Sequence, residues 1–190
     1  PQAPRLLENA YSAMDAVVVG SLLISLLRHA DRVTAASLAQ LVNVIAPITT
    51  EPQGPAWRQT TFYPFAITSR LARGTVLDPK IDSPTMATDA YGDVPMVDAV
   101  ATHDGETGTA SVFLVNRSIT ETVTISIDAG PLGVDSVHSA QTLHDEDFSA
   151  GNTLQDQDRV VPEPNKSARM ENGTVTVTLP PVSWTALELH

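Results

Sequence analysis

Residues 39–48 read Ala-Gln-Leu-Val-Asn-Val-Ile-Ala-Pro-Ile, and the part from position 41 onward is almost wholly apolar. A short apolar run of this length is typical of a parallel strand that is buried on both faces. Residues 49–59 hold two prolines and one glycine, which predict a loop. We therefore expect a buried strand over residues 41–48 and a loop directly after it.

Helical patterns lie on both sides of this run. Residues 13–27 are apolar on both helical faces, which is typical of a buried helix, and Ser12 with Asp15 three residues later resembles a capping box. We also expect a short helix over residues 33–40 and another over residues 60–71, with Pro64 in or near its first turn. A helix, a buried strand, a loop and a helix form a fragment of a parallel α/β sheet.

The composition changes near Gly74, after which Val, Thr, Asp, Gly and Pro dominate. Several segments then alternate apolar and polar residues with a period of two, which predicts strands over 96–102, 109–116, 121–127, 173–179 and 183–189. We expect an antiparallel sandwich that buries Phe113, Val115, Val123, Ile125, Val175, Val177 and Trp184. The expected fold class is therefore α+β, divided at residues 73 and 74.

Charge and composition exclude several classes of partner. The chain has 190 residues, with 11 Lys and Arg against 22 Asp and Glu and a net charge of −11, so neither nucleic acid nor an anionic membrane surface is an expected partner. The sequence has no apolar run of about 18 residues, the length of a membrane span. There is no cysteine, as is typical of cytosolic proteins, and no signal-peptide pattern. We expect a cytoplasmic protein, and the start at Pro1 suggests a piece of a longer one.

The sequence shows no cofactor or metal motif. None of the five histidines has a partner at the i, i+4 spacing of a helical metal site, and no Walker or Rossmann glycine pattern occurs. His144 precedes Asp145, Glu146 and Asp147, which we interpret as a solvated acidic loop. We expect neither a metal nor a cofactor.

One family matches these segments. The run 39–48, followed by Gly54-Pro-Ala-Trp-Arg-Gln-Thr-Thr-Phe-Tyr-Pro-Phe65, strongly resembles the C-terminal part of glycoside hydrolase family 51, the α-L-arabinofuranosidases. The resemblance continues upstream through residues 15–33, and downstream through Phe113-Leu-Val-Asn-Arg-Ser118 and Leu179-Pro-Pro-Val-Ser-Trp184. It covers nearly the whole chain.

This resemblance implies a fold and an activity. Residues 1–73 would be the C-terminal end of a (β/α)8 TIM barrel, with 41–48 as its last strand, and residues 74–190 a jelly-roll-like β-sandwich. The family removes terminal α-L-arabinofuranosyl residues from arabinan, arabinoxylan and oligosaccharides with retention of configuration. Both catalytic glutamates would lie upstream of Pro1, so this chain would hold no catalytic residue. The rest of the barrel or another copy of the protein, in a homo-oligomer, would cover residues 1–73.

The carboxylates of this chain agree with that implication. A retaining glycosidase needs two carboxyl groups about 5–5.5 Å apart. In residues 1–73 only Glu51 follows the C-terminal end of the expected strand, where barrel active sites form. A single carboxylate cannot fill both roles.

Two residues are candidate substrate contacts. The resemblance makes Gln59 a contact, because its amide can donate to and accept from sugar hydroxyls; the alternative is that it fastens the loop. Trp57 would stack on a sugar ring or lock the loop as a core residue. Arg58 is expected in a structural ion pair and Asn43 in hydrogen bonds inside the barrel.

Two other hypotheses concern residues 74–190 as a domain of its own. One is a non-catalytic carbohydrate-binding module, and the other is a structural and assembly sandwich, which we favour over it. Binding modules present exposed aromatic rings, whereas the aromatic residues after Gly74 are only Tyr91, Phe113, Phe148 and Trp184. Two exposed coplanar rings would support the binding module.

Overall fold

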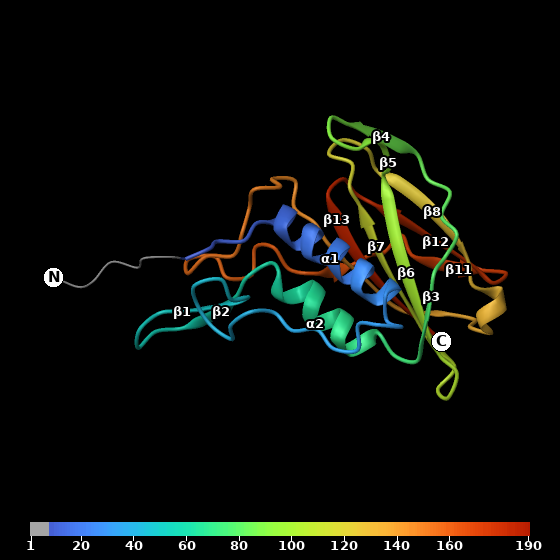
Figure 1. Cartoon of the computed structure of the whole chain (residues 1–190), viewed down its shortest axis with the longest axis horizontal. Coiled ribbons are helices and arrows are strands. Elements are labelled where there is room, and N and C mark those ends of the chain that lie inside the picture. Colours follow the sequence, from blue (N-terminus) through green and yellow to red (C-terminus); the bar gives the residue numbers. More distant parts are fainter. Residues whose placement is uncertain (1–7) are drawn as a thin grey trace.

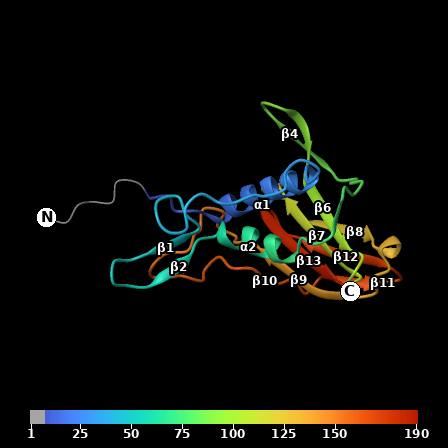
Figure 2. The same cartoon turned by 60° about the horizontal axis from the view of Figure 1, so that its bottom comes forward.

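The computed structural model describes residues 8–190 and is mostly β-structure with two α-helices. Helices α1 and α2 lie on one face of a six-stranded antiparallel sheet, and a three-stranded sheet lies on the other face (Figures 1 and 2). The strand orders are β10-β9-β13-β7-β6-β3 and β11-β12-β8. Two hairpins, β1-β2 and β4-β5, stand apart from these sheets.

The helices are α1 (Ala13–Arg28) and α2 (Phe62–Leu71), with a short 3-10 helix, η1 (Gly130–Leu132). The strands are β1 (Ile48–Thr50), β2 (Ala56–Arg58), β3 (Thr75–Leu77), β4 (Thr85–Thr88), β5 (Gly92–Pro95), β6 (Val97–Asp104), β7 (Thr109–Asn116), β8 (Val123–Asp128), β9 (Val137–Leu143), β10 (Glu163–Pro164), β11 (Arg169–Glu171), β12 (Thr174–Leu179) and β13 (Ser183–Leu189). The five strands expected after Gly74 are therefore confirmed as β6, β7, β8, β12 and β13.

Helix α1 begins at the predicted capping box. The backbone N–H of Asp15 donates to Ser12 Oγ at 3.3 Å, and the Ser12 N–H donates back to Asp15 Oδ2 at 2.8 Å, so two otherwise orphaned groups are satisfied. The helix ends with Arg28 in its last turn, where a cation suits the helix dipole. Helix α2 also forms where it was predicted, with Pro64 in its first turn.

The strand expected over residues 41–48 is wrong. Residues 41–47 form turns and bends, and Asn43 and Val44 both have a φ of 61°, a left-handed conformation that no strand contains. A parallel strand needs neighbours on both edges for its N–H and C=O groups. Only Ile48–Thr50 becomes a strand, and it pairs antiparallel with β2.

The helix expected over residues 33–40 is also wrong, since these residues have no helical turn. An isolated helix this short is unstable in water without an apolar face packed on a partner. Ala35, Ala36 and Ser37 are exposed, so packing does not supply what helix propensity lacks.

The six-stranded sheet carries a separate apolar core on each face, because side chains alternate along a strand. Facing the helices, Phe113, Val115 and Trp184 pack with Ile24 of α1 and Ile67 of α2. The opposite face packs against the three-stranded sheet and contains Val112, Leu114, Leu187, Val175 and Val177. The residues expected in one sandwich interior are therefore divided between two cores, with Val123 and Ile125 only partly buried.

Candidate functional site

The hairpin β1–β2 positions the predicted substrate contacts. Its antiparallel register pairs Thr49 with Trp57 and Ile48 with Arg58, and Gln59 follows at the end of β2. Asn43 binds the first strand of this hairpin to the turn before it, because its Oδ1 accepts a hydrogen bond from the Thr50 N–H at 2.7 Å. Asn43 is thus satisfied by a turn and not by a barrel interior.

Gln59 is 4% exposed, and its amide binds three backbone groups. Nε2 donates to the carbonyls of Asn9 at 3.0 Å and Ala46 at 2.9 Å, and Oε1 accepts from the Tyr11 N–H at 2.9 Å. Both amide hydrogens are used and one oxygen lone pair remains. These contacts fasten the hairpin to the segment before α1, and the substrate contact of Gln59 stays a prediction.

Trp57 is half-buried, and its indole N–H donates to the carbonyl of Asn152 at 3.2 Å. The side chain of Asn152 is buried and donates to the carbonyls of Arg58 at 3.0 Å and Val160 at 3.1 Å. The hairpin is therefore tied to the long loop between β9 and β10. Trp57 and Gln59 lie in one hairpin, but their polar atoms bind different segments.

Arg58 lies over the ring of Phe62, with 5.0 Å between the guanidinium carbon and the ring centroid. Burial raises the pKa of the Tyr63 phenol above its ordinary value; the Asp158 carboxylate also raises it, and the Arg58 guanidinium opposes them. The cation of Arg58 is thus placed by an aromatic face and lies near an acid and a phenol.

Three acidic residues of the first 73 take part in local structure: Asp15 in α1, Asp31 after it, and Glu51 between β1 and β2. The carboxylate of Asp15 accepts from both the N–H and the Oγ of Ser12 at 2.8 Å. Asp31 is exposed and lies 3.6 Å from Arg32. Glu51 lies in the turn of the β1–β2 hairpin, where its backbone N–H donates to the Pro55 carbonyl at 3.0 Å. These placements do not assign a catalytic role to any of them.

The outer side of α1 carries an exposed apolar stripe. Residues four apart, Met14, Val18, Leu22 and Leu26, are 43%, 52%, 59% and 38% exposed. Leu41 and Val42, in the segment expected as a strand, are 78% and 42% exposed. The expectation that α1 is buried all round is thus met on one side only. A continuous row of large apolar side chains is typical of a surface that another part of a protein covers.

Residues 74–190, all of which the structure describes, expose one ring among their Phe, Tyr and Trp residues. Tyr91, at the tip of the β4–β5 hairpin, is 84% exposed, whereas Phe113 and Trp184 are buried and Phe148 is half-buried. A cleft of about 770 Å³ between β6–β7 and β8 is lined by aliphatic residues such as Val97 and by charged ones such as Lys80 and Asp82, and no aromatic residue is among those that line it. The coplanar pair that would support a carbohydrate-binding module is absent from this part of the chain.

The structure also gathers three residues that the spacing argument missed: His138, Glu188 and His190. The argument tested only helical i, i+4 spacing, whereas side chains two apart in a strand share a face, as Glu188 and His190 do. The contribution of His138 from another strand has no sequence signal. Among residues 8–190, no helix is long and apolar enough to cross a membrane.

Comparison with known proteins identifies similar chains. The family model described as "Alpha-L-arabinofuranosidase C-terminal domain" matches residues 1–183. An exo-α-(1→6)-L-arabinofuranosidase from Bifidobacterium longum is 59% identical over 100% of this chain and 37% of its own length. An intracellular exo-α-(1→5)-L-arabinofuranosidase from Streptomyces lividans is 51% identical over 98% of this chain and 28% of its own length.

The fold is shared with solved structures. A family 51 α-L-arabinofuranosidase from Bifidobacterium longum superposes with a TM-score of 0.94 and 50% identity, over 100% of this chain and 37% of that one. The enzyme from Xanthomonas axonopodis pv. citri superposes with a TM-score of 0.86 and 28% identity, over 97% of this chain and 37% of that one. This chain therefore spans between 28% and 37% of the length of these relatives.

Proposed function

This chain belongs to the family of α-L-arabinofuranosidase C-terminal domains, and from that membership we propose that it is the C-terminal part of a retaining exo-acting α-L-arabinofuranosidase. The proposed reaction removes terminal α-L-arabinofuranosyl residues from arabinan, arabinoxylan and their oligosaccharides. Relatives named for α-(1→6) and α-(1→5) activity support this substrate class. Retention requires a nucleophilic carboxylate and a second carboxyl that acts as acid and then as base. We place both upstream of Pro1.

The apolar stripe of α1 is the observation that carries this proposal. Residues 1–73 would be the end of the catalytic barrel, and residues 74–190 the jelly-roll-like sandwich behind it. The preceding barrel strands and helices would then cover Met14, Val18, Leu22 and Leu26.

In this arrangement the β1–β2 hairpin follows the last barrel strand, at the end of the barrel where active sites form. Trp57 would offer its ring face to the sugar, since its N–H is already bonded to Asn152. Gln59 would use the remaining lone pair of Oε1 toward a sugar hydroxyl. Its three backbone bonds would hold that oxygen in a fixed direction.

We further propose a homo-oligomeric, cytoplasmic enzyme. Relatives from several bacteria carry the word intracellular in their names, which supports the location. Light scattering of the full-length protein tests the oligomer, and a single-subunit mass would contradict it. Carbohydrate binding by residues 74–190 alone has less support, since Tyr91 is the one exposed ring among their Phe, Tyr and Trp residues.

The test separates the chain from the whole enzyme. Three proteins are purified: residues 1–190, the upstream part, and the full-length protein. Each is incubated with 4-nitrophenyl α-L-arabinofuranoside. We expect turnover by the full-length protein and none by residues 1–190, since both catalytic carboxyls are missing from them. Turnover by a mixture of the two parts would support the divided barrel, and turnover by residues 1–190 alone would contradict the proposal.

A further inference from the structure

Strands β9 and β13 pair with an irregularity near their ends. Val137 pairs with Leu189 and Ser139 pairs with Glu188, so His138 is an extra residue on β9 with no partner on β13. This is the pattern of a β-bulge, which redirects a side chain and is often found at sheet edges and functional sites.

The bulge places consecutive residues on one face of the sheet. Val137 and Ala140 both pack into the core between the two sheets, so the residues between them, His138 and Ser139, lie toward the opposite face. Ser139 confirms this direction, because its Oγ donates to Glu188 Oε2 at 3.1 Å.

On β13 the alternation of side chains adds two more residues to the same face. Leu187 and Leu189 are buried in the core between the sheets, so Glu188 and His190 point away from it. The backbone of His190 is held by Ser136, whose N–H donates to the His190 carbonyl at 2.9 Å and whose carbonyl accepts from the His190 N–H at 3.1 Å. The end of the strand is therefore ordered by hydrogen bonds.

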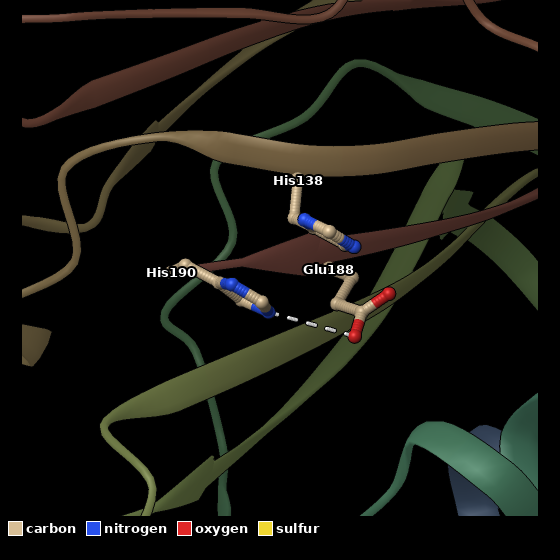
Figure 3. A group of neighbouring side chains, drawn as sticks. All are labelled: His138, Glu188 and His190. Atoms are coloured by element: carbon tan, nitrogen blue, oxygen red, sulfur yellow. Dashed lines mark ion pairs between the residues drawn. The ribbon is translucent and has the colours of Figure 1, made fainter.

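The three side chains converge in Figure 3, where the two imidazole rings lie one above the other with the carboxylate beside them. The ring centroids of His138 and His190 are 4.2 Å apart with 6° between the planes. His190 Nε2 lies 3.6 Å from Glu188 Oε1, and one ligand atom from each residue lies within 4.8 Å of the other two.

We propose that His138, Glu188 and His190 bind a divalent transition-metal ion, for which Zn²⁺ is the test ion. Two imidazoles and a carboxylate are a recognised ligand set for zinc, with water in the fourth position. Ligand atoms around a tetrahedral zinc lie about 3.3 Å apart, given bonds of about 2.0–2.1 Å. The 3.6 Å separation of Glu188 and His190 is close to that value. The two ring planes are nearly parallel, so their nitrogen lone pairs do not converge in the stacked arrangement, and ion binding requires the exposed His138 ring to turn out of the stack.

Two further features favour a cation here. The hydrogen bond from Ser139 orients the second oxygen of Glu188, as outer partners orient metal ligands in known sites. The net charge of −11 favours cations over anions around this molecule. A bound ion would join β9 to the end of β13 and so stabilise the folded state, because the unfolded chain does not hold the three ligands together.

The experiment uses the full-length enzyme, treated with EDTA and then dialysed, with zinc chloride titrated in a calorimeter. His138→Ala removes one ligand and Glu188→Gln another, while His103→Ala is the matched control, since His103 lies on β6 outside the cluster. We expect the wild type and His103→Ala to bind one more equivalent of Zn²⁺ than His138→Ala. Glu188→Gln should weaken this site at least about tenfold.

A second readout is thermal. Zn²⁺ should raise the melting temperature of the wild type and of His103→Ala, and should not raise that of His138→Ala. Melting in EDTA checks that every variant is folded. If His138→Ala does not fold, Glu188→Gln still tests the proposal. Equal zinc stoichiometry and affinity in the wild type and both cluster variants would overturn the proposal, as would a wild type that binds no zinc.

Discussion

An ideal Cβ on Gly20 of α1 would lie 2.2 Å from Cδ1 of Trp184 in β13, so the backbone of the helix rests directly on the indole ring. Trp184 is fully buried and stacks on Phe113, with 6.4 Å between the ring centroids. A side chain at position 20 would have to push the helix away from the sheet. This contact therefore sets how closely α1 packs on the six-stranded sheet.

Gly20→Ala should destabilise the protein. Alanine favours a helix over glycine by roughly 0.5–1 kcal/mol, but overpacking a well-filled core costs about 1–3 kcal/mol. We expect a net loss of stability, measured as a lower urea midpoint of the full-length enzyme. Gly105→Ala, in the turn after β6, is the control and should not lower it, because a Cβ there meets no atom within 4 Å. A stabilised Gly20→Ala variant would show that the helix can move away from Trp184 at little cost.

Asp98→Asn should weaken the attachment of α1 to the sheet. Asp98 on β6 is bound by Arg28 of α1 and by Arg117, and its side chain is only 13% exposed. Hydrogen bonds to charged groups contribute about 1.5–3 kcal/mol, so we expect a loss of that size in the free energy of unfolding.

Asp78→Asn is the matched control for Asp98→Asn. Asp78 also pairs with Arg28, at 3.1 Å, but its side chain is 76% exposed. Exposed ion pairs contribute about 0–1 kcal/mol, so its loss should be small. Equal effects of the two substitutions in chemical denaturation would contradict this difference.

Gln59→Ala should lower both stability and activity of the full-length enzyme. It removes the partner of three backbone groups, of Asn9, Tyr11 and Ala46. Only the bond to Ala46 is buried, and leaving that carbonyl unpaired costs about 1–3 kcal/mol. Loss of the proposed sugar contact should lower kcat/KM by about tenfold to a hundredfold, since about 1.4 kcal/mol corresponds to a factor of ten.

The two effects of Gln59→Ala are separated by assaying well below the melting temperature. Gln155→Ala, at an exposed position, is the control. A lower melting temperature with unchanged kinetics would assign Gln59 to the fastening role alone.

Leu22→Ser should have opposite effects in two proteins. Leu22 is 59% exposed in this chain, so in isolated residues 1–190 the substitution should reduce aggregation without loss of stability. In the full-length enzyme the proposed barrel covers Leu22, and the lost burial should cost about 2–4 kcal/mol. Equal melting temperatures of the full-length wild type and variant would show that nothing covers this stripe.

The local features of the fold were predictable because their causes are local. The side chains of Ser12 and Asp15 close the helix cap within four residues, and the alternation in 109–116 and 183–189 requires strands whatever their partners. Gln59 is singled out by the family resemblance and by an amide that can both donate and accept. Its three backbone partners could not be predicted, since they lie 13 to 50 residues away in sequence.

The sequence by itself therefore determined the two helices, the main strands and the resemblance to one enzyme family. The tertiary structure decided what depends on distant partners. Residues 41–47 share the apolar pattern of a strand but form turns, because a strand exists only where another strand accepts its hydrogen bonds. Alternation predicted that Trp184 and Val177 are buried, but packing on both faces of the sheet assigned them to different cores. A bulge, which no local pattern announces, brought His138 to Glu188 and His190.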